Sequence, residues 1–286
     1  MEEEAIANLF NNNKKLSTFL LRLFSGILLL IGLIVILYTG GDLLFCVCAL
    51  LSIIGLIELY RVFNLSKSML AYAAYLLTIF YYIILIFYKS NGILLFLISL
   101  LLFLLIFYVI SYPKYNIKEV AMVFFGIIYV AITFSFIYLI REKNEYGKIL
   151  IWLIFISSWG SDTFAYCIGH IFGKHKFLPI LSPNKTIEGA IGGILGAAFL
   201  GILYNILVLN RFSDDPIFSS IRVGFATAFG SVLSILGDLT ASAIKRDYNV
   251  KDYGDIIPGH GGILDRFDSV IFTAPALYFF LSIKYV

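Results

Sequence analysis

Apolar residues fill most of this chain in long runs that short polar segments separate. Each run is close to the roughly 20 residues that an α-helix needs to cross about 30 Å of hydrocarbon. The pattern therefore predicts about nine membrane-spanning helices. They are expected over residues 16–38, 42–60, 70–88, 92–112, 119–140, 148–171, 187–209, 217–240 and 267–285.

The composition agrees with a chain whose solvent is lipid. Of the 286 residues, 60% are hydrophobic and 14% are charged, and the mean hydropathy is +0.95; soluble globular domains do not look like this. The net charge of +3 comes without a basic tract, which argues against nucleic acid as a partner. The three cysteines have neither disulfide-framework nor zinc-ligand spacing. The sequence predicts an all-α polytopic membrane protein.

The basic residues indicate how the helices are oriented. Lysine and arginine in short loops favour the cytoplasmic side, and with a cytoplasmic N-terminus that side collects about twice as many as the other. The residues on that side are Lys14, Lys15, Arg61, Lys67, Lys114, Lys118, Lys174, Lys176, Lys185, Lys245, Arg246, Lys251 and Arg266. An odd number of spans then places the C-terminus outside.

Polar residues divide the chain into two parts. Residues 1–145 form a predicted transmembrane scaffold of about five helices, with few charges inside the apolar runs. Residues 146–286 hold most of the Gly, Asp and His and form a predicted catalytic domain of about four helices. Its motif-bearing loops, 172–188 and 241–267, fall on the cytoplasmic side, where nucleotides are. We therefore expect an active site at the cytoplasmic face.

The most polar segment lies between the eighth and ninth runs. Asp238, Ser242 and Lys245 are spaced i, i+4 and i+7, so they share one face of a helix. Asp265 and Asp268, at i and i+3, share a face of the next helix. Two helix ends can therefore direct three carboxylates to one point.

Three carboxylates at one point repel each other unless a cation lies between them. Oxygen ligands without His or Cys favour Mg²⁺ over zinc, so Asp238, Asp265 and Asp268 are the predicted ligands of one or two divalent cations. The alternative is that these aspartates cap helices or form ion pairs. Nearby basic residues for such pairs are Arg246, Lys251 and Arg266.

A glycine-rich link precedes the ninth run. Three glycines within residues 258–262 disfavour a helix and let the backbone approach phosphate oxygens closely. Gly261, Gly262 and His260 are therefore candidate substrate contacts. Such links are also common as plain turns, and His260 is equally well explained as a loop or capping residue.

Two further polar sites interrupt the second half. Before the seventh run, Ser182, Lys185 and Thr186 could hold phosphates, although an ordinary loop with a capping residue explains them too. Within the sixth run Asp162 lies deep among apolar residues, with Tyr166 and His170 on the same face. An ionisable group at that depth is costly, which makes Asp162 a candidate site residue.

These motifs together resemble the phosphatidate cytidylyltransferase (CDP-diglyceride synthetase) family. The family signature, a Ser, Lys-Arg, Lys-Asp, His-Gly-Gly and Asp-Arg-x-Asp, is matched by Ser242, Lys245-Arg246, Lys251-Asp252, His260-Gly261-Gly262 and Asp265-Arg266-Phe267-Asp268. The family's Ser-Pro-x-Lys-Thr-x-Glu-Gly element matches residues 182–189. The segment from Asp162 to Tyr166 resembles the segment that precedes this element in the family. One departure is Asn184, where family members often carry a second Lys, which weakens any two-lysine phosphate clamp.

The resemblance implies an enzyme of phospholipid biosynthesis. Its members are Mg²⁺-dependent nucleotidyltransferases of the cytoplasmic membrane, often homodimers, that use CTP and phosphatidic acid and release pyrophosphate. On this basis Asp238, Lys245, Asp265 and Asp268 are the expected catalytic residues. Lys185, Arg246 and Arg266 would offset phosphate charge, and Asp162, Ser182, Thr186, Ser242, Lys251, Asp252, His260, Gly261 and Gly262 complete the expected substrate site.

Two other functions stay open from the sequence. A cytidylyltransferase or kinase acting on an isoprenoid lipid could use the same metal site. An ion transporter could also use an intramembrane aspartate such as Asp162, but the halves show no inverted repeat and the polar residues gather at one face.

Overall fold

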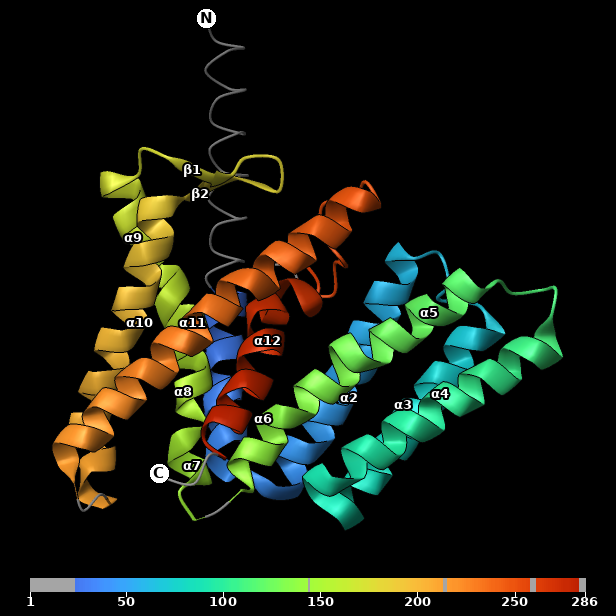
Figure 1. The fold of residues 1–286 in the computed structure, drawn as a ribbon, viewed down its shortest axis with the longest axis horizontal. Coiled ribbons are helices and arrows are strands. Elements are labelled where there is room, and N and C mark those ends of the chain that lie inside the picture. The colour runs from blue at the N-terminus through green and yellow to red at the C-terminus, as the bar shows by residue number, and fades with distance from the viewer. Residues whose placement is uncertain (1–23, 144, 213–214, 258–260, 283–286) are drawn as a thin grey trace, which may run out of the picture.

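The protein is a bundle of long helices with one small β-hairpin (Figure 1). The computed structural model describes residues 24–143, 145–212, 215–257 and 261–282. After a first described helix, Phe24–Thr39, the helices are α2 Gly41–Val62, α3 Met69–Tyr88, α4 Gly92–Ser111, α5 Ile117–Gly126, α6 Thr133–Arg141, α7 Gly147–Leu150, α8 Trp152–Phe155, α9 Ser161–Phe172, α10 Ile187–Leu207, α11 Pro216–Asp247 and α12 Leu264–Phe280. Short η segments at Lys89–Asn91, Ile127–Ile132, Ile156–Gly160 and Leu209–Phe212 join some of these helices.

The helices have the length and composition of membrane spans. Six helical stretches of the described residues qualify: Gly41–Val62, Met69–Ser111, Ile117–Arg141, Gly147–Phe172, Ile187–Leu207 and Pro216–Asp247. This confirms a polytopic helical membrane protein. Met69–Ser111 contains both α3 and α4, and two shorter helices, Phe24–Thr39 and α12, fall below that length. The count of nine spans therefore stays a prediction.

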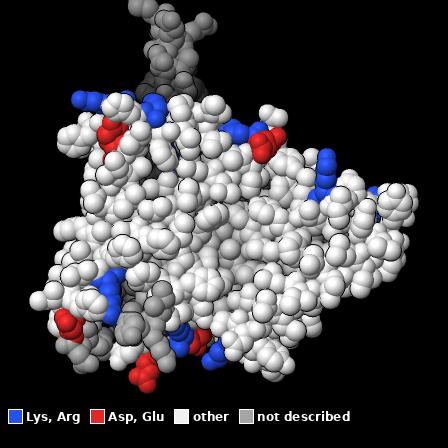
Figure 2. Space-filling view, in the orientation of Figure 1, with Lys and Arg blue, Asp and Glu red and all other residues white. Residues whose placement is uncertain are grey.

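On the face that Figure 2 shows, charged side chains avoid the middle of the surface. Figure 2 shows lysine, arginine, aspartate and glutamate mainly near two opposite edges of the molecule, with a broad uncharged band between them. Large apolar side chains such as Phe87, Leu94 and Ile110 are well exposed. An apolar exterior of this extent is stable only against hydrocarbon, because in water it would drive association.

Three helices of the second half pack closely through glycines. α10 packs against both α9 and α11, and its buried glycines include Gly189, Gly193 and Gly196. A Cβ at Gly193 would lie 2.9 Å from the Ser161 backbone oxygen, and one at Gly201 would meet the Thr227 side chain. Small residues let membrane helices approach at backbone distance, so the glycines determine how α9, α10 and α11 fit together.

The polar segments between helices are shorter than the sequence predicts, and one of them contains two strands. The expected loop 241–267 is reduced to residues 248–263, because α11 continues to Asp247 and α12 begins at Leu264. The expected loop 172–188 contains two strands, β1 Lys176–Leu178 and β2 Ser182–Thr186. They pair antiparallel, with Lys176 opposite Thr186. Hydropathy locates the point at which a helix becomes polar. The helical backbone hydrogen bonds of α11 continue beyond that point, to Asp247.

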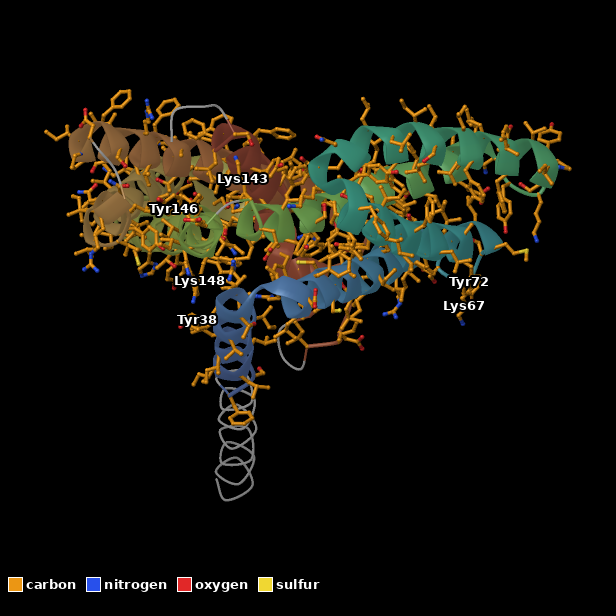
Figure 3. The ribbon with its side chains drawn as sticks, turned by 90° about the horizontal axis from the view of Figure 1, so that it is seen from below. Tyr38, Lys67, Tyr72, Lys143, Tyr146 and Lys148 are labelled. Atoms are coloured by element: carbon orange, nitrogen blue, oxygen red, sulfur yellow. The ribbon has the colours of Figure 1, made fainter. Side chains whose placement is uncertain are left out.

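Helices of both predicted domains pack against each other. α12 packs against α11 and also against α6 of the first half, which in turn packs against α2 (Figure 1). At the end opposite the hairpin, Gly40 and Gly41 have φ values of +64° and +54° and turn the chain from the first helix into α2. Nearby, the Lys148 ammonium lies 3.5 Å from the centroid of the Tyr38 ring (Figure 3). The division at residue 145 stays a prediction.

Replacing Gly193 with alanine should loosen the α9–α10–α11 unit. The new Cβ would overlap the Ser161 backbone, and overpacking of this kind costs about 1–3 kcal/mol. We expect the thermal unfolding midpoint of the detergent-solubilised protein to fall by several degrees. Gly32→Ala is the matched control, because nothing lies within 4 Å of its Cβ position; equal midpoints for the two variants would contradict this packing.

Candidate active site

A polar cavity of about 720 Å³ opens between the β-hairpin and four helices, α9, α10, α11 and α12. It brings together seven of the residues singled out in the sequence, from four separate segments of the chain. These are Asp162, Ser182, Lys185, Thr186, Asp238, Asp265 and Asp268. Lys176, Tyr166, His170 and Asn184 also line the cavity. The structure thus brings these seven residues to one place, while their chemical roles stay predictions.

The β-hairpin carries the basic and hydroxyl groups into the cavity. At its end, the Thr186 hydroxyl accepts a hydrogen bond from the Gly189 backbone N–H at 3.1 Å and caps α10. Glu188 then accepts hydrogen bonds from the backbone N–H groups of Lys174 and His175 and contacts His175 Nδ1 at 2.6 Å. These contacts join the two ends of the hairpin. The hairpin is thus fixed to α10, and Lys185 is held over the cavity.

Asp162 lines the cavity from α9. It is the second residue of α9, directly after the π-helical turn Ile156–Gly160. One widened turn shifts the face on which the following side chains project, and such turns recur at functional sites. The helix is fixed here because the Ser161 hydroxyl lies 2.6 Å from the Ser231 hydroxyl of α11. Tyr166 and His170, whose rings stack with centroids 6.0 Å apart, follow on the same side.

Asp238 and Lys185 form an ion pair across the cavity. Asp238 comes from α11 and Lys185 from β2, and both side chains are 28% exposed. A carboxylate can bind a cation and an ammonium can bind a phosphate, so each member of this pair could bind part of a charged ligand. The pair therefore has the chemistry expected of a site for an anionic ligand and its counterion.

Asp265 is held more tightly than any other carboxylate of the cavity. Its Oδ1 accepts a hydrogen bond from Lys245 Nζ at 2.8 Å, and its Oδ2 accepts from the backbone N–H groups of Tyr253 at 2.8 Å and Gly262 at 3.1 Å. The Asp265 side chain is 4% exposed. Burial raises the pKa of the neighbouring Tyr253 phenol, whose hydroxyl donates to the Ala241 carbonyl oxygen. Asp265 thus links α11, the connecting segment and α12.

The predicted metal ligands lie in the same cavity. Asp238, Asp265 and Asp268 supply the oxygen donors that Mg²⁺ prefers. Both oxygens of Asp265 already accept hydrogen bonds, whereas Asp268 is bonded through one oxygen to the Ser269 backbone N–H. Among the described residues, no three His, Cys, Asp or Glu side chains are grouped as a metal site. The donor chemistry fits a hard cation, and the three-ligand assignment stays a prediction.

Other predicted site residues lie outside the polar cavity. Arg246, Lys251 and Asp252 are exposed, and Ser242 is half-buried on α11. Gly261 adopts φ +83°, a conformation that glycine allows readily, and Gly262 is buried. His260 lies outside the described residues. The substrate roles of these residues therefore stay predictions.

A second, mostly apolar cavity of about 570 Å³ adjoins the first. Its walls come mainly from the first described helix, α2 and α12, and include Leu29 and Leu33, with Phe155 contributed by α8. Asp162, Asp265 and Asp268 line both cavities, and Arg266 lines the apolar one. A hydrocarbon-lined space therefore meets a charged space at three carboxylates.

One buried acid of the first half escaped the sequence analysis. Glu58 of α2 is completely buried, and its carboxylate oxygens accept hydrogen bonds from the backbone N–H groups of Ile263 and Leu264, both at 2.9 Å. The signal was present, because an acid inside an apolar run is costly wherever it occurs. Glu58 lies inside an apolar run just as Asp162 does.

Comparison with known proteins gives a consistent result. The Cytidylyltransferase family matches residues 20–284. Phosphatidate cytidylyltransferase of Staphylococcus haemolyticus is 35% identical over 260 residues, 90% of this chain and 96% of that protein, and its Staphylococcus saprophyticus counterpart is 34% identical over the same shares. Phosphatidate cytidylyltransferase of Bacillus subtilis is 41% identical over 169 residues, 59% of this chain and 61% of that protein.

Replacing Lys245 with methionine should destabilise the connection between α11 and α12. The variant leaves the buried Asp265 without its charged partner, and a hydrogen bond to a charged group contributes about 1.5–3 kcal/mol. We expect a lower thermal unfolding midpoint in detergent and faster proteolysis of the segment 248–263. Lys67→Met, an exposed lysine, is the control; a midpoint for Lys245→Met no lower than for this control would contradict the assigned role.

Proposed function

The chain belongs to the cytidylyltransferase family, and we propose that it transfers CMP from CTP to phosphatidic acid, giving CDP-diacylglycerol and pyrophosphate for phospholipid biosynthesis. The observation that carries this proposal is the junction of the two cavities at Asp162, Asp265 and Asp268. One cavity is charged and the other is lined by hydrocarbon. This pairing suits a reaction in which a water-soluble triphosphate meets the phosphate of a lipid.

The two cavities can divide the substrates between them. Lys176 and Lys185 give the polar cavity cationic groups for the phosphates of CTP. The apolar cavity suits acyl chains, and Arg266 lies on its wall, where a guanidinium can pair with the lipid phosphate. An isoprenoid lipid would satisfy the same chemistry, so the acceptor must be tested directly.

The proposed reaction is a single displacement at the α-phosphorus of CTP. An oxygen of the lipid phosphate forms the new bond to that phosphorus, the bond to the bridging oxygen breaks, and pyrophosphate leaves with the electron pair. The phosphate is already anionic at neutral pH, so no protein nucleophile is required. The residues of the chain contribute by orienting both phosphates and offsetting their charge, with Lys185 released from Asp238 to contact a phosphate.

We further propose that Asp238 and Asp268 hold Mg²⁺, with Asp265 as the third ligand of the sequence-based set. When bound, the cation would offset negative charge on the reacting phosphates. The carboxylate oxygens that Asp238, Asp265 and Asp268 contribute to the polar cavity support this assignment. The hydrogen bonds that Asp265 accepts from Lys245 and Tyr253 indicate that it also keeps the helix ends in place.

The proposal extends to the membrane arrangement. We infer nine spans in the cell membrane, with the N-terminus and the polar cavity on the cytoplasmic side and the C-terminus outside. The distribution of lysine and arginine in the sequence supports this orientation. The homodimer that the family resemblance implies stays a prediction, for which light scattering of the detergent complex is the direct measurement.

Purified protein with labelled CTP and phosphatidic acid should move label into the organic phase. We expect transfer only when both Mg²⁺ and phosphatidic acid are present, and none with EDTA. Polyprenyl phosphate in place of phosphatidic acid tests the isoprenoid alternative. Label transferred to polyprenyl phosphate but not to phosphatidic acid would overturn the proposed substrate, and transfer in EDTA would overturn the metal requirement.

The same assay tests the carboxylates. Asp268→Asn should lower turnover more than tenfold, because it removes an anionic donor from the cavity, while the unfolding midpoint changes little. Asp247→Asn is the matched control, an exposed aspartate at the end of α11, and should retain full turnover. Full turnover by Asp268→Asn would remove that residue from the proposed metal site.

The orientation can be tested at the two ends of α3. In a variant lacking the native cysteines, Lys89→Cys should react with a membrane-impermeant maleimide in intact cells. Lys67→Cys should react only after lysis, because it lies on the proposed cytoplasmic side. Both lysines are exposed, so access depends on the membrane alone, and the reverse labelling pattern would overturn the orientation.

A further inference from the structure

We propose that Glu58, in the first half of the chain, is a positioning residue that fixes the start of α12 and through it Asp265 and Asp268. The inference rests on the proposed function, because Glu58 affects turnover only through the positions of Asp265 and Asp268 in the proposed reaction. Glu58 is separated by 205 and 206 residues from the two residues that it binds. It is therefore a direct link between the predicted scaffold and the site.

Glu58 satisfies a helix end that has no cap of its own. The residue preceding α12, Ile263, makes no side-chain capping hydrogen bond, although the first N–H groups of any helix lack partners within it. Glu58 Oε1 accepts from Ile263 and Oε2 accepts from Leu264, both at 2.9 Å. One carboxylate thus caps α12 with both oxygens, and its negative charge suits the positive end of the helix dipole.

Two glycines make room for this carboxylate. A Cβ at Gly254 would lie 2.6 Å from Glu58 Oε1, and a Cβ at Gly262 would lie 2.7 Å from both carboxylate oxygens. Neither glycine has positive φ, so backbone conformation alone does not require glycine at these positions. The connecting segment is therefore shaped around the Glu58 side chain.

Glu58 and Asp265 hold consecutive amides of one short segment. Asp265 accepts from the backbone N–H of Gly262, and Glu58 accepts from those of the next two residues, Ile263 and Leu264. The backbone at the start of α12 is consequently fixed immediately before Asp265 and one turn before Asp268. Displacing reacting groups by about 1 Å can cost about 100-fold in rate, so a contact made here affects turnover.

A role in packing alone does not explain an acid at this position. Burying a carboxylate is costly, and a well-packed apolar side chain of similar volume often gives equal or greater stability. The Glu58 side chain is completely buried, and its neighbours are the amides and glycines of the motif-bearing segment. What the acid adds is a defined orientation of that segment.

The first test compares Glu58→Gln with Glu58→Asp. Glutamine keeps the size but directs an NH₂ group at one of the two amide N–H groups, so we expect kcat to fall about 10- to 100-fold with the KM for CTP changed less than about twofold. Aspartate keeps the charge and should restore part of kcat. The control is Ser52→Ala, a buried hydroxyl of α2 bonded to Tyr82, which should lower stability without lowering kcat.

A double-mutant cycle tests the contact itself. Gly254→Ala should impair the wild-type protein, because its Cβ meets Glu58, and should add little in a Glu58→Ala background, where that space is free. Equal effects of Gly254→Ala in the two backgrounds would overturn the inference. It would also be overturned if the kcat of Glu58→Gln per folded molecule matched that of Ser52→Ala.

A readout independent of catalysis separates this inference from the proposed function. Lys251 is exposed in the segment that Glu58 organises, so trypsin should cleave after Lys251 at least fivefold faster in Glu58→Gln than in the wild type, with Ser52→Ala unchanged. Unchanged cleavage would overturn the positioning role. If the wild type transfers no label from CTP but cleavage behaves as expected, the proposed function fails while the role of Glu58 stands.

Discussion

The buried Lys245–Asp265 ion pair is the interaction on which the rest of the site depends. It joins α11 to α12, and because Asp265 also accepts from the amides of Tyr253 and Gly262, it determines the course of the segment between them. A buried charge pair is stable only when its remaining hydrogen-bonding capacity is satisfied, and here two backbone amides supply it. The result is a rigid corner from which Asp238 and Asp268 face one cavity.

The site is assembled from both halves of the chain, and it lies where a charged cavity adjoins an apolar one. Glu58 reaches the corner from α2, and the β-hairpin approaches from the other side with Lys185. The carboxylates lie where a charged cavity meets an apolar one, so a lipid phosphate and a nucleotide could meet without either entering an unsuitable environment. Asymmetry of this kind distinguishes an enzyme acting at a membrane surface from a protein that conducts ions across the membrane.

Much of this arrangement could be predicted from the sequence, for identifiable reasons. Apolar runs located the helices because lipid leaves a backbone few other choices, and the i, i+3 spacing of Asp265 and Asp268 correctly placed both on one cavity. The β-hairpin was missed because its residues carry no alternating pattern. The hydrogen bonds of Asp265 were missed because backbone donors leave no mark on a sequence. Glu58 was detectable as a lone acid in an apolar run, but its partners, more than 200 residues away, were not.

The length of α11 has a consequence for where the chemistry occurs. Its 32 residues extend about 48 Å at 1.5 Å per residue, well beyond a hydrocarbon layer of about 30 Å. Asp238 lies 22 residues after Pro216, about 33 Å along the axis, a separation comparable to the thickness of that layer. The number of residues before Asp238 therefore determines its position along the helix. Inserting one residue would move Asp238 by about 1.5 Å along the helix axis and rotate it by about 100° about that axis. Depth and direction of this carboxylate are therefore fixed together by the register of a single helix.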